Sequence, residues 1–183
     1  MKKLSTFITE RSYDKYQEVK YNDPIKDALY SYVSGLTSGV NDDLRKGITS
    51  GSKNVIKNLD AAFVNKEKIN SYRVVTWEYL ENIYGLTQSN IDDYIGKTLE
   101  NKGYMSTSKK STSVWGTMIS DELMMHIVST KPYPCIDVNS ILPAEDIDCE
   151  SQEEILLPRN TKVKLLSYTI TPDKTYLLEM EIQ

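Results

Sequence analysis

Three short segments, far apart along the chain, carry side chains that could act together in a chemical reaction. They are Tyr72-Arg73-Val74, Ser106-Thr107-Ser108, and Gln152-Glu153-Glu154 followed by Ile155-Leu156-Leu157-Pro158-Arg159. Arg73 offers a planar, permanently charged fork that suits phosphate oxygens. Glu154 abuts an apolar run, so burial can constrain its carboxylate, and a constrained carboxylate can stabilise a positive charge that develops in a transition state. Taken singly, none of these residues identifies a reaction, so their meaning depends on the set that they form.

The supply of histidine and cysteine excludes several other chemistries. The chain has one histidine, His126, and two cysteines, Cys135 and Cys149, whereas a structural zinc site needs four nitrogen or sulfur ligands. A Ser-His-Asp or Cys-His mechanism would have to use His126, which we interpret as a packed strand residue of the apolar segment 123–128. The cysteines could pair, but nothing in the sequence indicates that they do.

Glycine spacing and charge exclude further classes. The eight glycines never fall as G-x-G-x-x-G or G-x4-G-K-[ST], which argues against a Rossmann dehydrogenase and a P-loop NTPase. The formal net charge of −4 argues against general nucleic-acid binding. Seven acidic residues and no lysine or arginine lie between Lys131 and Arg159, in a segment that we interpret as a solvated loop leading into the strand after it.

Length and composition predict one folded domain. The 183 residues are 39% hydrophobic and 26% charged, and a chain of this length buries roughly 70% of its unfolded surface, enough for a core without disulfides. No apolar run approaches the ~18 residues that a membrane helix needs. Lys2 and Lys3 resemble the start of a signal peptide, but Glu10, Arg11 and Asp14 interrupt the apolar stretch that should follow. We expect a soluble protein without an export signal.

Helical patterns precede strand patterns. Apolar residues repeat at helical spacing in five segments, 10–21, 24–34, 40–46, 52–63 and 89–100. Residues that favour strands gather in six segments, 71–77, 104–107, 122–128, 135–138, 161–170 and 174–182. This order predicts an α+β fold with mostly antiparallel strands. We expect a single domain over 1–183, with a helical part at about 1–70 and a β core at about 71–183.

The three segments, in this order, resemble the motif set of mono-ADP-ribosyltransferases of the bacterial toxin and phage type. That set is an aromatic-Arg strand, a Ser-Thr-Ser strand, and an E/Q-x-E motif running into Leu-Leu-Pro-Arg. The matches at 102–108 and 152–159 are the most specific, and Asn41-x-x-Leu44-Arg45 resembles the family's helical N-x-x-L-R element. The Gln-x-Glu form is closest to the Rho-modifying clostridial exoenzymes. The resemblance implies a two-sheet core that holds NAD in the cleft between the sheets.

The resemblance also implies a reaction. NAD would be a consumed substrate, not a redox cofactor, and its nicotinamide–ribose bond would break through a cationic sugar, as in glycoside cleavage. Glu154 would stabilise that cation and bind the nicotinamide ribose, Ser106 would hold Glu154 and the ribose, and Arg73 would bind the phosphates. No metal is required. NAD glycohydrolase activity would accompany transfer, since water can intercept the same cation.

Further residues of the NAD site follow from the same resemblance. Asn41 would add a hydrogen bond and Arg45 would be a second phosphate ligand, although both could instead lie on a solvated helix face. Thr107 and Ser108 belong to the NAD-binding set through their motif. Trp115 either stacks on NAD or packs in the core.

The residue two positions before Glu154 helps to choose the acceptor in this family. Here it is Gln152, whose amide suits a neutral acceptor such as an asparagine side chain, whereas a glutamate there goes with arginine modification. Glu150 and Glu153 lie nearby and could supply the missing carboxylate. Because the acidic run before Gln152 would repel a phosphate backbone, we expect a target protein with a basic surface rather than a nucleic acid.

Two alternatives stay open at this stage. One is an arginine-specific or nucleic-acid-directed transferase, and the other is a catalytically silent binding module on the same fold. Rho is not carried over as the target, because the exoenzymes that modify it are basic and this chain is acidic. We expect a monomer that acts in the cytoplasm of a target or host cell and has no membrane partner.

Overall fold

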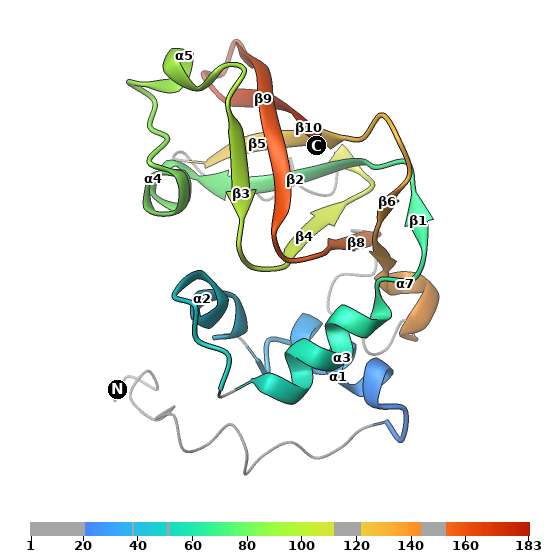
Figure 1. The fold of residues 1–183 in the computed structure, drawn as a ribbon. Helices are drawn as coiled ribbons and strands as arrows, with labels where there is room; N and C mark the ends of the chain where they lie inside the picture. The colour runs from blue at the N-terminus through green and yellow to red at the C-terminus, as the bar shows by residue number, and fades with distance from the viewer. Residues whose placement is uncertain (1–20, 38, 51, 112–121, 144–152) are drawn as a thin grey trace, which may run out of the picture. The chain divides into compact units, whose positions relative to one another are not determined.

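The computed structural model describes residues 21–37, 39–50, 52–111, 122–143 and 153–183 (Figure 1). The chain divides into two compact units with the boundary after Ala62. The predicted helix at 10–21 lies almost wholly outside the described residues. The predicted α+β class, with helices followed by mostly antiparallel strands, is confirmed.

The first unit contains α1 (Pro24–Val33), α2 (Val40–Arg45) and α3 (Lys53–Ala62), as their sequence patterns predicted. The Asp23 carboxylate accepts hydrogen bonds from the amides of Ile25 and Lys26, which satisfies two donors at the start of α1. Leu29 of α1 and Leu59 of α3 are both fully buried, and the two helices pack against each other. The apolar faces of these helices therefore form the core of this unit.

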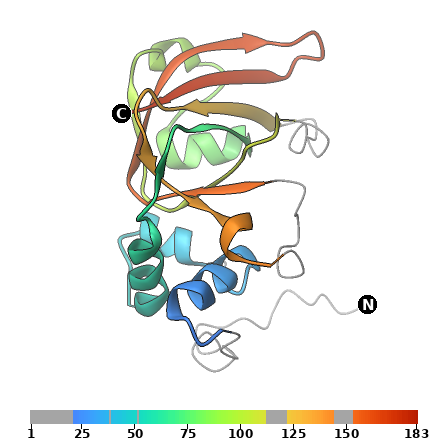
Figure 2. The ribbon, with the colours of Figure 1, turned by 90° about the vertical axis from the view of Figure 1, so that its right-hand side faces the viewer.

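The second unit is built on strands. In the described part of the chain, eight strands form a sheet in the order β3-β9-β10-β5-β2-β4-β8-β7, and β1 and β6 form a separate antiparallel pair. The bounds are β1 Lys66–Glu67, β2 Asn70–Thr76, β3 Thr98–Asn101, β4 Met105–Ser108, β5 Glu122–Val128, β6 Tyr133–Pro134, β7 Ile136–Asp137, β8 Glu154–Leu157, β9 Thr161–Ile170 and β10 Tyr176–Ile182. All neighbours in the large sheet are antiparallel except β10 and β5, which run parallel. Figure 2 shows the β9–β10 hairpin, in orange to red, beside the golden β5.

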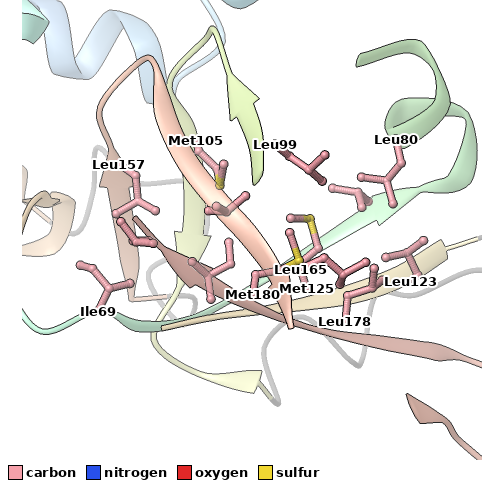
Figure 3. Close-up of a cluster of buried hydrophobic side chains, with 14 of the residues drawn as sticks. Ile69, Leu80, Leu99, Met105, Leu123, Met125, Leu157, Leu165, Leu178 and Met180 are labelled. Atoms are coloured by element: carbon pink, nitrogen blue, oxygen red, sulfur yellow. The ribbon is translucent and has the colours of Figure 1, made fainter. Parts of the chain in front are cut away.

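One face of the central strands forms the core of this unit. Leu178 and Met180 of β10, Leu165 of β9 and Leu123 and Met125 of β5 point into one apolar cluster (Figure 3). Each is at most 2% exposed. The alternation along β10, in which Glu179 and Glu181 face the other way, is the pattern that predicted a half-buried strand.

The predicted helix over 89–100 is wrong. The structure has a four-residue helix, α5 (Ile91–Tyr94), followed by the strand β3. Gly96, in the left-handed region at φ 83°, separates them, and its amide donates to the Leu165 carbonyl. Tertiary pairing of β3 with β9 thus outweighs the helical pattern of this stretch.

A further helix, α4 (Trp77–Tyr84), was not expected from the sequence. The strand expected at 71–77 includes Trp77, an aromatic residue, but Trp77 is the first residue of this helix. The Thr76 hydroxyl accepts a hydrogen bond from the Tyr79 amide, and Gly85 closes the helix in the left-handed conformation. Thr76 and Gly85, with no helix breaker between them, are the sequence signals that mark this helix.

The pairing between β2 and β4 is much shorter than that between β2 and β5. β2 pairs with β5 at every position from Asn70 to Thr76, but its described pairing with β4 is the single pair Tyr72–Ser108. Beyond Tyr72 the two strands no longer share a ladder. The large sheet therefore consists of two parts, β3-β9-β10-β5-β2 and β4-β8-β7, joined at one point.

Candidate active site

A cavity of about 250 Å³ opens where β2 and β4 stop pairing. It is lined by Tyr72, Arg73, Val74, Ser106, Thr107, Ser108 and Glu154. All three segments singled out from the sequence therefore contribute to one pocket: β2 supplies the arginine, β4 the three hydroxyl residues, and β8 the glutamate. The pocket has one cation and one carboxylate among the described residues that line it.

Arg73 follows Tyr72 on β2, where β2 and β4 no longer pair, and its side chain bonds to β4 in place of the backbone. Its Nη1 donates a hydrogen bond of 2.7 Å to the Ser106 carbonyl, and its guanidinium carbon lies 5.3 Å from the centre of the Tyr79 ring on α4. The stack fixes the plane of the guanidinium. Its Nε is buried and has no hydrogen-bond partner among the described residues. A buried donor without a partner is costly unless a ligand supplies an acceptor.

Glu154 is half-buried at the start of β8, opposite Ser108. Burial raises the pKa of its carboxyl, while a hydrogen bond with the Ser106 side chain and the positive charge of Arg73 lower it, and burial has the largest effect. The carboxyl is thus less acidic than an ordinary glutamate, although two favourable partners lie beside it. Ser106 thus contacts both other residues, because its carbonyl accepts a hydrogen bond from Arg73 and its side chain hydrogen-bonds with Glu154, while Arg73 acts on Glu154 through its charge.

Thr107 and Ser108 line the pocket, but their hydroxyls make hydrogen bonds within the protein. Thr107 Oγ1 donates to the Ile155 carbonyl at 2.9 Å, which ties β4 to β8. Ser108 Oγ accepts from the Lys110 amide and donates to the Lys110 carbonyl, both at 3.0 Å, which turns the chain after β4. Of the three hydroxyls, that of Ser106 is the one that acts on Glu154.

Two expected NAD ligands lie in the helical unit. Asn41 Nδ2 donates to the Tyr32 hydroxyl at 2.8 Å. Arg45 Nη1 lies 2.9 Å from Asp42 Oδ1, an ion pair within the same helix α2. Three other expected site residues, Trp115, Glu150 and Gln152, lie outside the described residues. Glu153 is described: it forms a 2.5 Å ion pair with Lys110.

Two residues that were not expected from the sequence also hold the site together. Tyr79 carries the stack under Arg73, and the unrecognised cap at Thr76 is the signal that could have found its helix. Asn139, in α7 (Val138–Ile141), accepts a 3.0 Å hydrogen bond from the Glu154 amide. Because this contact joins residues fifteen apart across a segment without a clear pattern, no local signal marks it.

His126 is a half-buried strand residue, as predicted. Its ring stacks on Tyr72 with the centroids 4.7 Å apart, and its two nitrogens lie 2.7 Å from Glu179 Oε2 and 2.8 Å from Asn70 Oδ1. His126 does not line the pocket. Cys135 is buried, and burial raises the pKa of its thiol; Cys149 lies outside the described residues.

Metal-binding clusters and membrane-spanning helices are both absent from the described residues. No three histidine, cysteine, aspartate or glutamate side chains gather closely enough there to hold a metal ion. No helix in that part of the chain has the length and apolar character to cross a membrane.

Several solved structures share this fold. The chain is similar to the C3 exoenzyme of Clostridium limosum, with 18% identity, a TM-score of 0.70, and 100% of this chain and 98% of that chain covered. An ADP-ribosyltransferase from Clostridium botulinum gives 19% identity and a TM-score of 0.69 over 96% of each chain. A C3 protein from S. aureus, solved with NAD, gives 16% identity and a TM-score of 0.65 over 90% of this chain and 89% of that one. No curated protein matches the sequence.

The sequence itself matches a family model. The model described as ADP-ribosyltransferase exoenzyme covers residues 10–182, which includes all three motif segments and extends over both units of the structure. This match confirms the resemblance inferred from the motifs, and it supports the toxin type without bearing on phage enzymes. The chain belongs to the ADP-ribosyltransferase exoenzyme family.

Proposed function

We propose that this protein is a mono-ADP-ribosyltransferase that cleaves NAD at the nicotinamide–ribose bond and transfers ADP-ribose to a side chain of a target protein. The observation that carries the proposal is the joint position of Arg73, Ser106 and Glu154 in one pocket. The family match and the NAD bound to the S. aureus relative, which has the same fold, support NAD as the substrate.

Glu154 supplies the electrostatic part of the chemistry. As the carbon–nitrogen bond breaks, nicotinamide leaves with the bonding electrons and the ribose C1 becomes cationic. An ionised carboxylate beside that carbon stabilises the transition state more than the uncharged sugar of the ground state. The acceptor atom then bonds to C1 and loses its proton. Where water takes the acceptor's place, the product is free ADP-ribose.

Arg73 binds the phosphates of NAD. Tyr79 and the Ser106 carbonyl fix the plane of its guanidinium, and its buried Nε–H has no acceptor among the described residues. A phosphate oxygen would supply that acceptor with a charge-assisted hydrogen bond. We assign further NAD contacts to Asn41, Arg45 and Trp115 through the family motif, with Thr107 and Ser108 shaping the pocket wall.

We assign the choice of acceptor to Gln152. Its amide suits a neutral acceptor such as asparagine, and Glu150 and Glu153 would contribute to a surface that meets a basic region of the target protein. Gln152 and Glu154 together give this chain the Gln-x-Glu form of the motif. Tagged NAD added to a lysate, followed by protease or nuclease digestion and mass spectrometry, would identify the acceptor and separate an asparagine, an arginine and a nucleic acid.

Nicotinamide release from NAD tests the proposal directly. We expect the wild-type protein to release nicotinamide in the absence of an acceptor, and Glu154→Gln to do so at least about 100-fold more slowly, which corresponds to about 2.7 kcal/mol of transition-state stabilisation. Glutamine keeps the size of the side chain, removes its negative charge and replaces one acceptor oxygen with an NH2 donor. The rate of the wild-type protein should fall on acidification at a pH above the ordinary glutamate range, because burial raises the pKa of Glu154.

Glu81→Gln is the matched control, because Glu81 is an exposed glutamate on α4 that does not line the pocket. It should keep the wild-type rate. Equal rates for wild type and Glu154→Gln, or no release by a folded wild-type protein over a range of pH, would contradict the proposal.

A further inference from the structure

The backbone on both sides of Glu154 is held by contacts outside the regular strand ladder. β8 pairs with β4 on one side and with β7 on the other. On the β7 side the last pair is Asp137–Ile155, after which the chain turns into α7. The next pair of that ladder would have been Val138 with Glu154. The Glu154 amide would therefore lack a strand partner at the position where the carboxylate must be aimed.

Asn139 supplies that partner. Its Oδ1 accepts a hydrogen bond of 3.0 Å from the Glu154 amide. A side-chain carbonyl thus takes the place of the main-chain carbonyl that β7 would have offered, and the strand geometry continues to Glu154 although β7 has ended. Without this acceptor, the first residue of β8 would have a free amide and greater freedom in φ.

The residue before Glu154 is also held, in an unusual conformation. Glu153 has a φ of 47°, in the left-handed region that costs energy for any residue with a Cβ. Its carbonyl accepts a 3.1 Å hydrogen bond from the Lys109 amide, and its carboxylate pairs with Lys110 at 2.5 Å. Strained residues of this kind persist where the surrounding structure holds them, and they concentrate at functional sites.

A third contact spans β8 itself. Lys109, the residue directly after β4, has its Nζ 2.7 Å from Asp137 Oδ2 of β7. Ile155 is the residue of β8 that pairs with Asp137, so the ion pair crosses the strand one residue beyond Glu154. The hydrogen bond to Asp137 raises the pKa of Lys109, so the lysine stays charged at neutral pH. The helix α7 that carries Asn139 begins directly after this anchored aspartate.

We propose that Asn139 is a positioning residue that aims the Glu154 carboxylate into the pocket through its hydrogen bond with the Glu154 amide. The inference rests on the proposed function of Glu154. Asn139 is not among the residues that line the pocket, so its removal should lower kcat and leave the KM for NAD nearly unchanged. A small displacement of a catalytic group is enough to cost one to two orders of magnitude in rate.

The experiment compares three variants of the full chain in nicotinamide release. Asn139→Ala, which lacks the acceptor, should lower kcat about tenfold or more and change KM less than about twofold. Asn139→Asp keeps an acceptor oxygen and should recover most of the rate at high pH. Its added negative charge near Glu154 should shift the acid limb of its rate profile to higher pH. Ser140→Ala is the control: it removes a 2.7 Å hydrogen bond to the Asp137 carbonyl in the same helix and should keep the wild-type rate.

Amide hydrogen exchange separates the failure of this inference from failure of the proposed function. The Glu154 amide should exchange about tenfold or more faster in Asn139→Ala than in the wild-type protein, whether or not the protein cleaves NAD. Faster exchange with an unchanged kcat would overturn the positioning role and leave the proposed function standing. Unchanged exchange, a rate loss that Ser140→Ala matches, or an Asn139→Asp rate as low as that of Asn139→Ala at every pH would also overturn it.

Discussion

The two edges of β2 differ in how completely they pair with their neighbouring strands. Towards β5 it forms an unbroken ladder of seven pairs, and towards β4 the described pairing is Tyr72–Ser108 alone. The continuous side backs the apolar cluster, with Leu123 and Met125 of β5 buried in it. The interrupted side opens the pocket and is lined by an arginine, three hydroxyl residues and a glutamate.

The interrupted pairing of β2 accounts for the position of the polar residues. A complete ladder satisfies every backbone donor and acceptor, which leaves no need for side chains between the strands. Where β2 and β4 part, the Ser106 carbonyl accepts a hydrogen bond from Arg73 instead, and the Nε of the same guanidinium is buried without a hydrogen-bond partner among the described residues. Because β2 and β4 do not pair beyond Tyr72, the charged side chain of Arg73 can lie between the two strands.

The largest expected effect of breaking the continuous side is on stability. Leu123 is fully buried in the apolar cluster, so Leu123→Ala should lower the free energy of unfolding by about 2–5 kcal/mol through lost burial and a residual cavity. Denaturant unfolding measures this loss. The rate of nicotinamide release per folded molecule should change little under conditions where the variant is folded. A stability loss below about 1 kcal/mol would mean that this side of β2 does not carry the core.

On the interrupted side, Arg73→Lys should affect substrate binding more than stability. Lysine keeps the charge but loses the planar fork, the stack on Tyr79 and the Nε donor. We expect the affinity for NAD to fall about tenfold, which is about 1.4 kcal/mol. Isothermal titration with NAD measures it. Lys164→Arg, a cation exchange on β9 outside the pocket, is the control and should bind NAD like the wild-type protein. Unchanged affinity in Arg73→Lys would remove the phosphate role from Arg73.

The smallest effect is expected from Glu154→Gln on stability, and its sign is opposite to that of the core variant. Because burial raises the pKa of Glu154 in the folded state, the folded protein binds more protons than the unfolded chain as pH rises above the ordinary glutamate range. The wild-type protein therefore loses stability relative to Glu154→Gln across that interval, and the difference becomes constant above the folded-state pKa. Thermal unfolding of both proteins between acidic and neutral pH measures it. If the wild-type protein instead becomes more stable relative to Glu154→Gln as pH rises, then Ser106 and Arg73 stabilise the charged carboxylate by more than burial destabilises it.

The regular parts of this fold could be predicted from the sequence because their signals are local. The strand at 122–128 and the cap at Asp23 were found in this way. The conformation of segment 89–100 could not be predicted in this way, because it depends on the pairing of β3 with β9, a strand about sixty residues further along the chain. The helix after Thr76 was overlooked because its aromatic first residue is equally typical of a strand.

The candidate site likewise contains residues that the sequence predicts and contacts that it does not. Arg73, Ser106 and Glu154 were identified through the order of their motifs, and the structure brings them into one pocket. The contacts of Tyr79 with Arg73 and of Asn139 with Glu154 depend on where separate elements meet. Such contacts leave no periodic pattern in a single sequence, so only the tertiary structure reveals them.

The most direct measurement is a crystal structure of the Glu154→Gln protein soaked with NAD, in which slow cleavage preserves the dinucleotide. The amide at position 154 should lie within hydrogen-bond distance of the ribose that carries nicotinamide, with a phosphate oxygen on the Arg73 guanidinium. NAD bound away from the gap between β2 and β4, or a side chain at 154 turned from the ribose, would contradict it.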